Sequence, residues 1–119
     1  MKQYDYIFTG TGLSALMTVY EMVLSEKFSG ASILLLDENP KKTNDRTWCF
    51  WDVERAFAST VSKKWDHALF ANSEFSRNLE LKPYQYKMIR GLDFYQFIFD
   101  AISKHAKIDF SNEKVLDFV

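Results

Sequence analysis

The chain has 119 residues, and its hydrophobic fraction of 47% favours one folded domain over a disordered chain. Fifteen Lys and Arg residues against sixteen Asp and Glu residues leave a formal charge of −1, which predicts neither a nucleic-acid interface nor a polybasic membrane anchor. The single cysteine, Cys49, excludes an internal disulfide and a multi-cysteine zinc site, and it fits a reducing, cytoplasmic compartment.

The N-terminal segment resembles a secretion signal only in part. Residues 6–20 carry no charge and follow Lys2, but Asp5 interrupts the basic flank, and Gly10 and Gly12 break the apolar run. The stretch is also shorter than the roughly 20 apolar residues that span a bilayer. We therefore expect this segment to be folded structure.

The first third of the chain predicts a strand, a helix and a second strand. Residues 6–9 form a β-branched and aromatic run that ends at Gly10, and residues 33–36 are continuously aliphatic. Between them, apolar residues recur three and four positions apart, and Gly30 stands where a glycine commonly ends a helix. The expected helical stripe comprises Leu13, Leu16, Met17, Tyr20, Leu24 and Phe28. We expect a βαβ unit with parallel strands and a right-handed crossover.

The rest of the chain predicts a surface loop at residues 38–45, several short strands and a second helix. The expected strands are residues 65–71, 75–81, 84–89, 108–110 and 115–119, with turns at Asn72-Ser73 and Lys82-Pro83. The expected helix covers residues 92–106, with Leu92, Tyr95, Ile98, Phe99 and Ile102 on one side. The fold class is therefore α/β: a Rossmann-like βαβ unit of the FAD- or NAD(P)-binding type with a small antiparallel β region added.

The sequence Gly10-Thr11-Gly12-Leu13-Ser14-Ala15 is a G-x-G-x-x-A motif between the first strand and the helix. Gly10 permits a tight turn, Gly12 leaves room for a pyrophosphate, and a small residue at position 15 lets the helix approach the strand. The amides of Leu13 and Ser14, at the positive end of the helix, can face phosphates. Val19 departs from many such motifs, which carry a smaller Ala at that helix position.

Asp37, at the end of the second strand, is placed to accept hydrogen bonds from an adenosine ribose. A carboxylate there disfavours NADP, because it repels a 2′-phosphate. The alternative interpretation is a plain loop before a helix, with Asp37 as a solvated strand end. The strand, the spacing, the helix and the acid together favour a dinucleotide site.

An aromatic island, Arg46-Thr47-Trp48-Cys49-Phe50-Trp51, follows Asn44-Asp45. Together with Asp5-Tyr6-Ile7-Phe8, Leu34-Leu35-Leu36-Asp37 and Tyr86-Lys87-Met88-Ile89-Arg90, it resembles the lycopene β-cyclase family of carotenoid biosynthesis. The resemblance covers nearly the whole chain and only the N-terminal part of that family. It implies a flavoprotein that uses reduced FAD without net electron transfer. The reaction it implies is an isomerisation, in which the ψ end groups of lycopene close into β-ionone rings by way of a carbocation.

The resemblance also gives the aromatic island two interpretations. Trp48, Phe50 and Trp51 can be ordinary core residues, or they can line a polyene site, because aromatic faces stabilise cations by roughly 0.5 to 2 kcal/mol per contact. Arg46 can be a surface cation or, by analogy of fold, a partner of the flavin. The predicted cofactor-binding residues are Gly10, Gly12, Leu13, Ser14, Asp37 and Arg46.

The remaining polar residues predict no metal site and no catalytic pair. We expect Cys49 to be a buried apolar residue, and His67 and His105 to be isolated at or near the surface. Glu80, Asp93 and Asp100 form no paired-carboxylate pattern, so the catalytic acid stays unassigned.

In the family that the chain resembles, the proton donor and a second flavin-contacting segment belong to motifs that lie downstream of the part matching residues 1–119. We therefore expect an incomplete FAD-binding domain without cyclase activity of its own, which binds FAD weakly or not at all and self-associates. For the full-length enzyme the resemblance implies a carotenoid substrate and peripheral contact with the inner membrane, and we expect no nucleic-acid partner. Two alternatives remain: a NAD-dependent dehydrogenase domain, which would continue in βα repeats, and a non-catalytic fragment without a cofactor.

Overall fold

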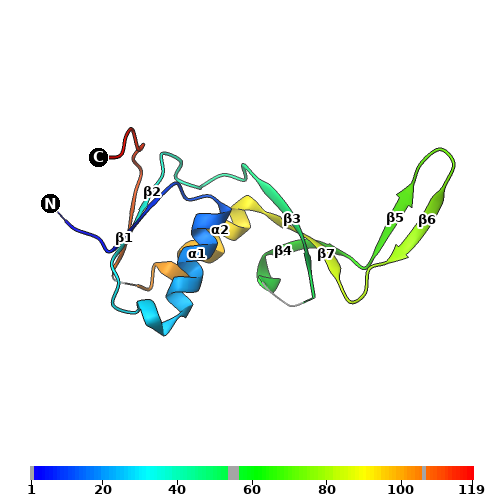
Figure 1. Cartoon of the computed structure of the whole chain (residues 1–119), viewed down its shortest axis with the longest axis horizontal. Coiled ribbons are helices and arrows are strands. Elements are labelled where there is room, and N and C mark those ends of the chain that lie inside the picture. The colour runs from blue at the N-terminus through cyan, green and yellow to red at the C-terminus, as the bar shows by residue number, and fades with distance from the viewer. Residues whose placement is uncertain (1, 54–56, 106) are drawn as a thin grey trace. The chain divides into compact units, whose positions relative to one another are not determined.

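The computed structural model describes residues 2–53, 57–105 and 107–119 (Figure 1). The chain divides into two compact units. The first comprises Met1–Lys42 and Tyr95–Val119, and the second comprises Thr43–Phe94.

The first unit is built on a three-stranded parallel sheet. Its elements are β1 (Tyr6–Thr9), α1 (Leu13–Leu24), the short 3₁₀ helix η1 (Glu26–Phe28), β2 (Ile33–Leu36) and β8 (Ile108–Ser111). The strand order is β1-β2-β8, and β2 is parallel to both neighbours, with Ile33 in register with Tyr6 and with Ile108. The predicted parallel βαβ unit is confirmed. Sequence alone did not reveal that the strand at residues 108–111 extends this sheet.

The core of the first unit lies around β2, where Ile33 and Leu35 are buried. On α1 the buried residues are Leu16, Val19 and Met22, whereas Met17 and Leu24 of the predicted stripe are exposed. Apolar residues occupy more than one side of this helix, so their spacing alone could not select the buried side. Val19 is fully buried, and the core accommodates it.

Aromatic contacts connect the helices and β8 in the first unit. The rings of Tyr20 on α1 and Phe97 on α2 (Gly91–Ile102) have centroids 5.5 Å apart, and Phe99 meets Phe110 of β8 edge-on at 5.5 Å. These contacts add to the burial of Ile98 and Ile102 on the same helix. The second predicted helix is thus confirmed, although it ends at Ile102 and residue 106 lies outside the described residues.

Two predictions of element ends were wrong. Helix α1 ends at Leu24, where the Ser25 amide donates to the Glu21 carbonyl, and Gly30 lies beyond η1 without the positive φ of a helix-terminating glycine. Residues 115–119 form no strand, and Leu116 and Phe118 are exposed. Among the residues that the structure describes, no strand pairs with this apolar run, and a strand needs such a partner for its backbone groups.

The second unit is antiparallel, as predicted. Strands β3 (Thr47–Asp52), β7 (Gln85–Arg90) and β4 (Val61–Trp65) form a sheet in that order. A separate hairpin pairs β5 (His67–Ala71) with β6 (Ser76–Glu80), and the 3₁₀ helix η2 (Ala58–Thr60) precedes β4. The predicted strand 65–71 is divided at Asp66, and the aromatic island was not recognised as a strand.

Helix α2 begins at a close backbone contact in the second unit. The Gly91 amide donates to the Arg46 carbonyl at 2.6 Å, just beyond the register pair of Thr47 and Arg90. A Cβ atom added at Gly91 would lie 2.8 Å from that carbonyl oxygen. Only glycine fits here without moving the backbone.

We therefore expect Gly91→Ala to destabilise the protein. Steric overlap of this kind costs roughly 1–3 kcal/mol, and the better helix propensity of Ala offsets about 1 kcal/mol. The free energy of unfolding, measured by urea titration, should fall by up to about 2 kcal/mol. Gly30→Ala is the matched control, since nothing lies within 4 Å of its added Cβ. Equal stability of the two variants would contradict the assigned contact.

Candidate functional site

The glycine loop lies at the carboxyl end of the parallel sheet, directly after β1. Gly10 has a φ of +97°, a backbone conformation that residues with a side chain rarely adopt. Its amide donates to the Leu36 carbonyl at 2.6 Å, which ties the loop to the end of β2. The predicted tight turn at Gly10 is confirmed by this geometry.

Gly12 follows as the N-cap of α1, in an ordinary extended conformation with φ of −73°. Nothing lies within 4 Å of a Cβ atom added there, so the space in front of Gly12 is open. Gly12 provides no side-chain cap, and the first turn of α1 contains no acidic residue. The amides of Leu13 and Ser14 therefore depend on solvent or a ligand for an acceptor. This end of the helix can accept an anion.

The Asp37 carboxylate holds the loop from the end of β2. Its Oδ2 accepts hydrogen bonds from the amide and the hydroxyl of Thr11, at 2.7 and 2.9 Å, and Thr11 is fully buried. Its Oδ1 accepts from the Asn39 amide at 2.8 Å, and the Lys41 ammonium lies 3.4 Å from Oδ2. Four neighbouring groups thus stabilise the ionised carboxylate.

The pKa of Asp37 reflects the balance of burial and these contacts. Burial by itself would raise the pKa, but the hydrogen bonds from Asn39 and Thr11 and the charge of Lys41 outweigh it. The net effect lowers the pKa of Asp37 below its ordinary value. The group is therefore ionised near neutral pH.

These contacts limit what Asp37 can offer a ribose. A carboxylate has about four acceptor positions, and three of those on Asp37 are taken by Thr11 and Asn39. One position on Oδ1 remains for a hydroxyl group. The proposed contact with an adenosine ribose stays a prediction, and it has to coexist with the contact to Thr11.

A hollow of about 350 Å³ opens beside the loop. Thr9, Gly10, Leu36, Asp37 and Glu38 line it on one side, and Glu113, Lys114, Val115 and Phe118 line it on the other. The second group follows β8, which is anchored to the end of β2 because the Asp37 amide donates to the Ser111 carbonyl at 3.2 Å. The carboxyl ends of parallel strands meet at one edge, where open α/β sheets bind ligands.

Sequence reasoning missed Thr11, Lys41 and the segment after β8 as parts of this site. Thr11 stood inside the motif at a variable position, and only its buried hydroxyl shows that it binds Asp37. Lys41 was placed in a surface loop, yet it lies near Asp37 and within 5.5 Å of the Tyr95 ring centroid. The alternation of helix and strand over residues 91–111 was the available signal for the third segment.

Arg46 belongs to the second unit, so the structure does not test its predicted contact with the flavin. Its side chain is exposed, and its backbone carbonyl accepts the Gly91 amide. Both interpretations of Arg46 stay open.

The aromatic island forms β3, and strand alternation divides its side chains between two faces. Trp48 and Phe50 are half-buried, and the Trp48 ring meets Phe94 edge-on at 5.4 Å. Trp51 is exposed on the other face, and so is Cys49. The prediction that Cys49 is buried was wrong, because the residue alternates with the inward-facing Trp48 and Phe50.

The second unit also contains an ion pair that the sequence did not reveal. The Lys87 ammonium donates to the Asp52 carboxylate at 2.8 Å, and the two side chains are only 7% and 14% exposed. Removing one partner of such a pair leaves a buried charge, which typically costs 3–5 kcal/mol. The pair therefore fixes the orientation of both strands, since Asp52 and Lys87 lie on β3 and β7.

The remaining histidines and acidic residues of the described chain lie apart from one another or in surface ion pairs. Among the described residues, no cluster of His, Cys, Asp or Glu could hold a metal ion. His67 and His105 are both exposed, as expected. Glu80 and Asp93 form ion pairs with Lys82 and Arg90.

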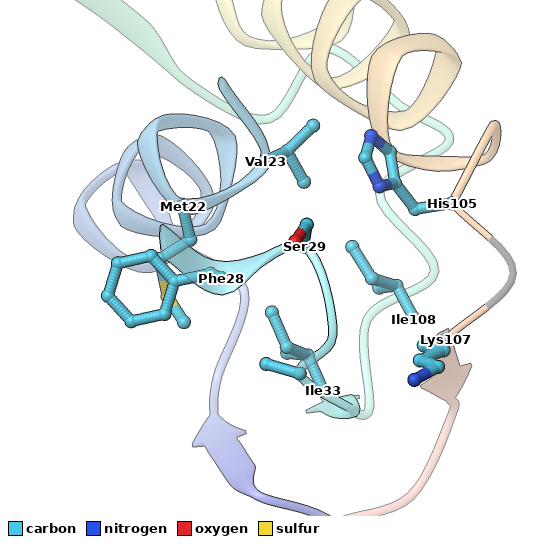
Figure 2. A pocket seen from close by; sticks show the side chains of 9 residues that line it. Met22, Val23, Phe28, Ser29, Ile33, His105, Lys107 and Ile108 are labelled. Carbon is cyan, nitrogen blue, oxygen red and sulfur yellow. The ribbon is translucent and has the colours of Figure 1, made fainter. Parts of the chain in front are cut away.

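A second hollow of about 200 Å³ lies at the amino ends of β2 and β8, opposite the glycine loop (Figure 2). Its walls are largely apolar, from Met22, Val23, Phe28, Ile33 and Ile108, with Ser29, His105 and Lys107 beside them. The Lys107 ammonium donates to the Gly30 carbonyl at 2.8 Å. This hollow is too small for a dinucleotide and lies at the wrong end of the sheet for one.

Comparison with known families identifies the chain. The family described as "Lycopene cyclase protein" matches residues 5–118. The chain belongs to the lycopene cyclase family. The resemblance inferred from the aromatic island is confirmed, and with it a role in carotenoid biosynthesis. No curated protein and no solved structure matches this lycopene cyclase chain.

Helices α1 and α2 of this chain have 12 residues each. Over the residues that the structure describes, none is long and apolar enough to cross a bilayer.

We expect Asp37→Asn to lower stability and to flatten its dependence on pH. Because the pKa of Asp37 is lowered in the folded protein, its stabilisation is present above the unfolded-state pKa of about 3.9 and is lost as the pH falls through the folded-state value. The free energy of unfolding should drop by about 1–3 kcal/mol at pH 7 in the variant. Urea titrations between pH 7 and pH 2.5 measure both effects.

Asp100→Asn is the control for that measurement, because Asp100 is exposed on α2. It should leave both the stability at pH 7 and the acid dependence of the wild type unchanged. An Asp37→Asn protein with the wild-type pH profile would show that the carboxylate does not hold the glycine loop.

Proposed function

We propose that this chain is the FAD-binding part of a lycopene cyclase that closes ψ end groups into β-ionone rings without net redox change. Support comes from the family assignment and from the glycine loop at the carboxyl edge of a parallel βαβ unit. The Rossmann-like character of the fold is part of this proposal. The order of elements around β1, α1 and β2 is the one that dinucleotide-binding proteins use.

The open space at Gly12 is the observation that carries the proposal. Its φ is ordinary and an added Cβ would meet nothing, so the fold itself tolerates a side chain there. The opening lies in front of the first turn of α1, where the amides of Leu13 and Ser14 lack intrahelical acceptors. A pyrophosphate suits such a position, since it supplies acceptors and negative charge and fills the space that a side chain would take.

In this proposal, each residue of the site makes a different contact with FAD or with the loop that binds it. Gly10 turns the chain, Leu13 and Ser14 donate to the pyrophosphate, and Asp37 fixes Thr11 and offers one acceptor position to the ribose. Arg46 is a further candidate partner. When bound in its reduced form, FAD supplies an electron-rich ring system next to a substrate that becomes cationic.

A NAD-dependent dehydrogenase is the less favoured alternative. Such a domain continues with βα repeats after the second strand. Here β2 is followed by the antiparallel strands β3 to β7, and a parallel strand returns only at β8. The substrate of the favoured function is a hydrocarbon that partitions into lipid, so we also propose that the enzyme works at a membrane surface.

The reaction can be tested in cells that accumulate lycopene and express the coding sequence containing these residues. The expected products have β-ionone rings, seen in the absorption spectrum, and the same mass as lycopene, because an isomerisation neither adds nor removes atoms. A product that differs by two hydrogens would indicate a redox enzyme and overturn the proposed reaction.

Gly12→Val tests the cofactor site directly. The valine side chain would occupy the space proposed for the pyrophosphate, so we expect the affinity for FAD to fall at least about 100-fold, as hydrogen bonds of about 1 kcal/mol each are lost. Flavin fluorescence during titration with the purified full-length enzyme that contains these residues measures the affinity, and circular dichroism verifies the fold. Gly30→Val, also at an open position, is the control and should bind like the wild type. A folded Gly12→Val protein with wild-type affinity would remove Gly12 from the site.

A further inference from the structure

One face of the β3-β7-β4 sheet carries three aromatic side chains in a row. Trp51 of β3 is in register with Tyr86 of β7, and Tyr86 is in register with Trp65 of β4. The ring centroids of Trp51 and Tyr86 are 4.7 Å apart, and those of Tyr86 and Trp65 are 5.8 Å apart. We call these three residues the aromatic row.

The aromatic row is open to solvent although its rings are large and apolar. Trp51 is 56% exposed and Trp65 is 39% exposed, and Tyr86 between them is half-buried. Trp48 and Phe50, on the opposite face of β3, are less exposed, and Trp48 contacts Phe94. Burial thus explains Trp48 and Phe50, and it does not explain the aromatic row.

Apart from Lys63, the nearest neighbours of the aromatic row on this face are uncharged. The next register positions hold Cys49, Met88 and Lys63, so two polarizable sulfur groups adjoin the rings. A hydrogen bond with the Cys49 thiol raises the pKa of Tyr86, which keeps its hydroxyl neutral. The described residues of these three strands place no carboxylate on this face, since Asp52 lies on the other one.

The size of the row argues for a small ligand and against a protein. Fully buried aromatic side chains contribute about 150–250 Å² each, so three half-exposed rings offer only about 300 Å². A stable protein interface needs about 800 Å² from each partner. Across three strands spaced about 4.8 Å apart, the row is roughly 10 Å long. These dimensions suit a narrow, flat molecule.

We infer that the aromatic row binds the conjugated chain of the carotenoid substrate. A polyene is linear, uncharged and unable to form hydrogen bonds, so it matches three neutral rings in a row with no carboxylate beside them. Stacking on aromatic side chains and dispersion contacts with the sulfur groups supply the attraction. The inference rests on the proposed function for the identity of the substrate and on the geometry of the sheet for its location.

The three tryptophans of the chain provide a direct test with the whole 119-residue protein. The probe is the methyl ester of trans-parinaric acid, an uncharged linear tetraene whose absorption overlaps tryptophan emission. Trp48→Phe retains both tryptophans of the row, and titration with the probe should quench its fluorescence strongly. The Trp51→Ala/Trp65→Ala double variant retains Trp48 as the reporter, and half-maximal quenching should need at least about tenfold more probe, because two aromatic contacts are lost.

Affinity is measured on a second set of variants by the fluorescence of the bound probe. Trp51→Ala and Tyr86→Ala should each weaken binding by about threefold to tenfold, as expected for the loss of one aromatic contact. Phe70→Ala is the matched control, because Phe70 is 62% exposed on the separate hairpin, and it should bind like the wild type. Circular dichroism checks that each variant is folded.

Three results would overturn the inference: half-maximal quenching at the same probe concentration in Trp48→Phe and in the double variant, equal loss of affinity in Phe70→Ala, or a dimer that the row variants dissociate in light scattering. The test separates this inference from the proposed function. Probe binding at the row without ring closure in lycopene-accumulating cells would refute the function and keep the site. Ring closure with an unchanged KM for lycopene in Trp51→Ala would support the proposed function and refute the aromatic row as the substrate site.

Discussion

The arrangement of the first unit depends on one half-buried carboxylate. Asp37 ends β2 and binds both the amide and the hydroxyl of Thr11, in the middle of the glycine loop. The Gly10 amide bonds in turn to the Leu36 carbonyl, one residue before Asp37. The last residue of β2 and the residue that follows it therefore determine where the loop lies, and the loop determines where α1 begins. A substitution at Asp37 would therefore change the position of the first turn of α1.

The second unit follows a different constraint, the alternation of side chains along a strand. In β3, residues 48, 50 and 52 share one face, and residues 47, 49 and 51 share the other. One face holds the Trp48–Phe94 contact and the Asp52–Lys87 ion pair. The other carries Trp51, Tyr86 and Trp65. Four consecutive residues, Trp48 to Trp51, thus serve both the packing of the unit and an exposed aromatic surface.

Sequence analysis predicted the parts of the fold that depend on local patterns. The aliphatic run at residues 33–36 and the glycine motif determined the βαβ unit, because each pattern has few structural solutions. Turns at Asn72-Ser73 and Lys82-Pro83 located the strands on either side of them. The family was recognised from the aromatic island and the short motifs around it.

Features that depend on contacts distant in sequence could not be predicted. The buried side of α1 was misassigned because apolar residues surround much of that helix, and the packed structure buries Val19 while Met17 is exposed. The exposure of Cys49 follows from the pairing of β3 with β7, which the composition of the island did not show. Thr11 became a site residue only through its contact with Asp37, which lies 26 positions away in the sequence. Lys41 is only four positions from Asp37, but its ion pair depends on how the loop folds.

The glycines show how structural and functional demands can be separated in such a chain. Gly10 is required by its positive φ, and Gly91 is required by the Arg46 carbonyl 2.8 Å from its missing side chain. Neither demand exists at Gly12 or Gly30, where an added Cβ meets nothing. These two differ in what surrounds the open space: Gly30 lies in a loop after η1, whereas Gly12 caps a helix whose first amides lack acceptors. A side chain at Gly12 would therefore block a polar opening that the fold leaves free, and this is why the case for a bound pyrophosphate depends on Gly12 more than on the motif as a whole.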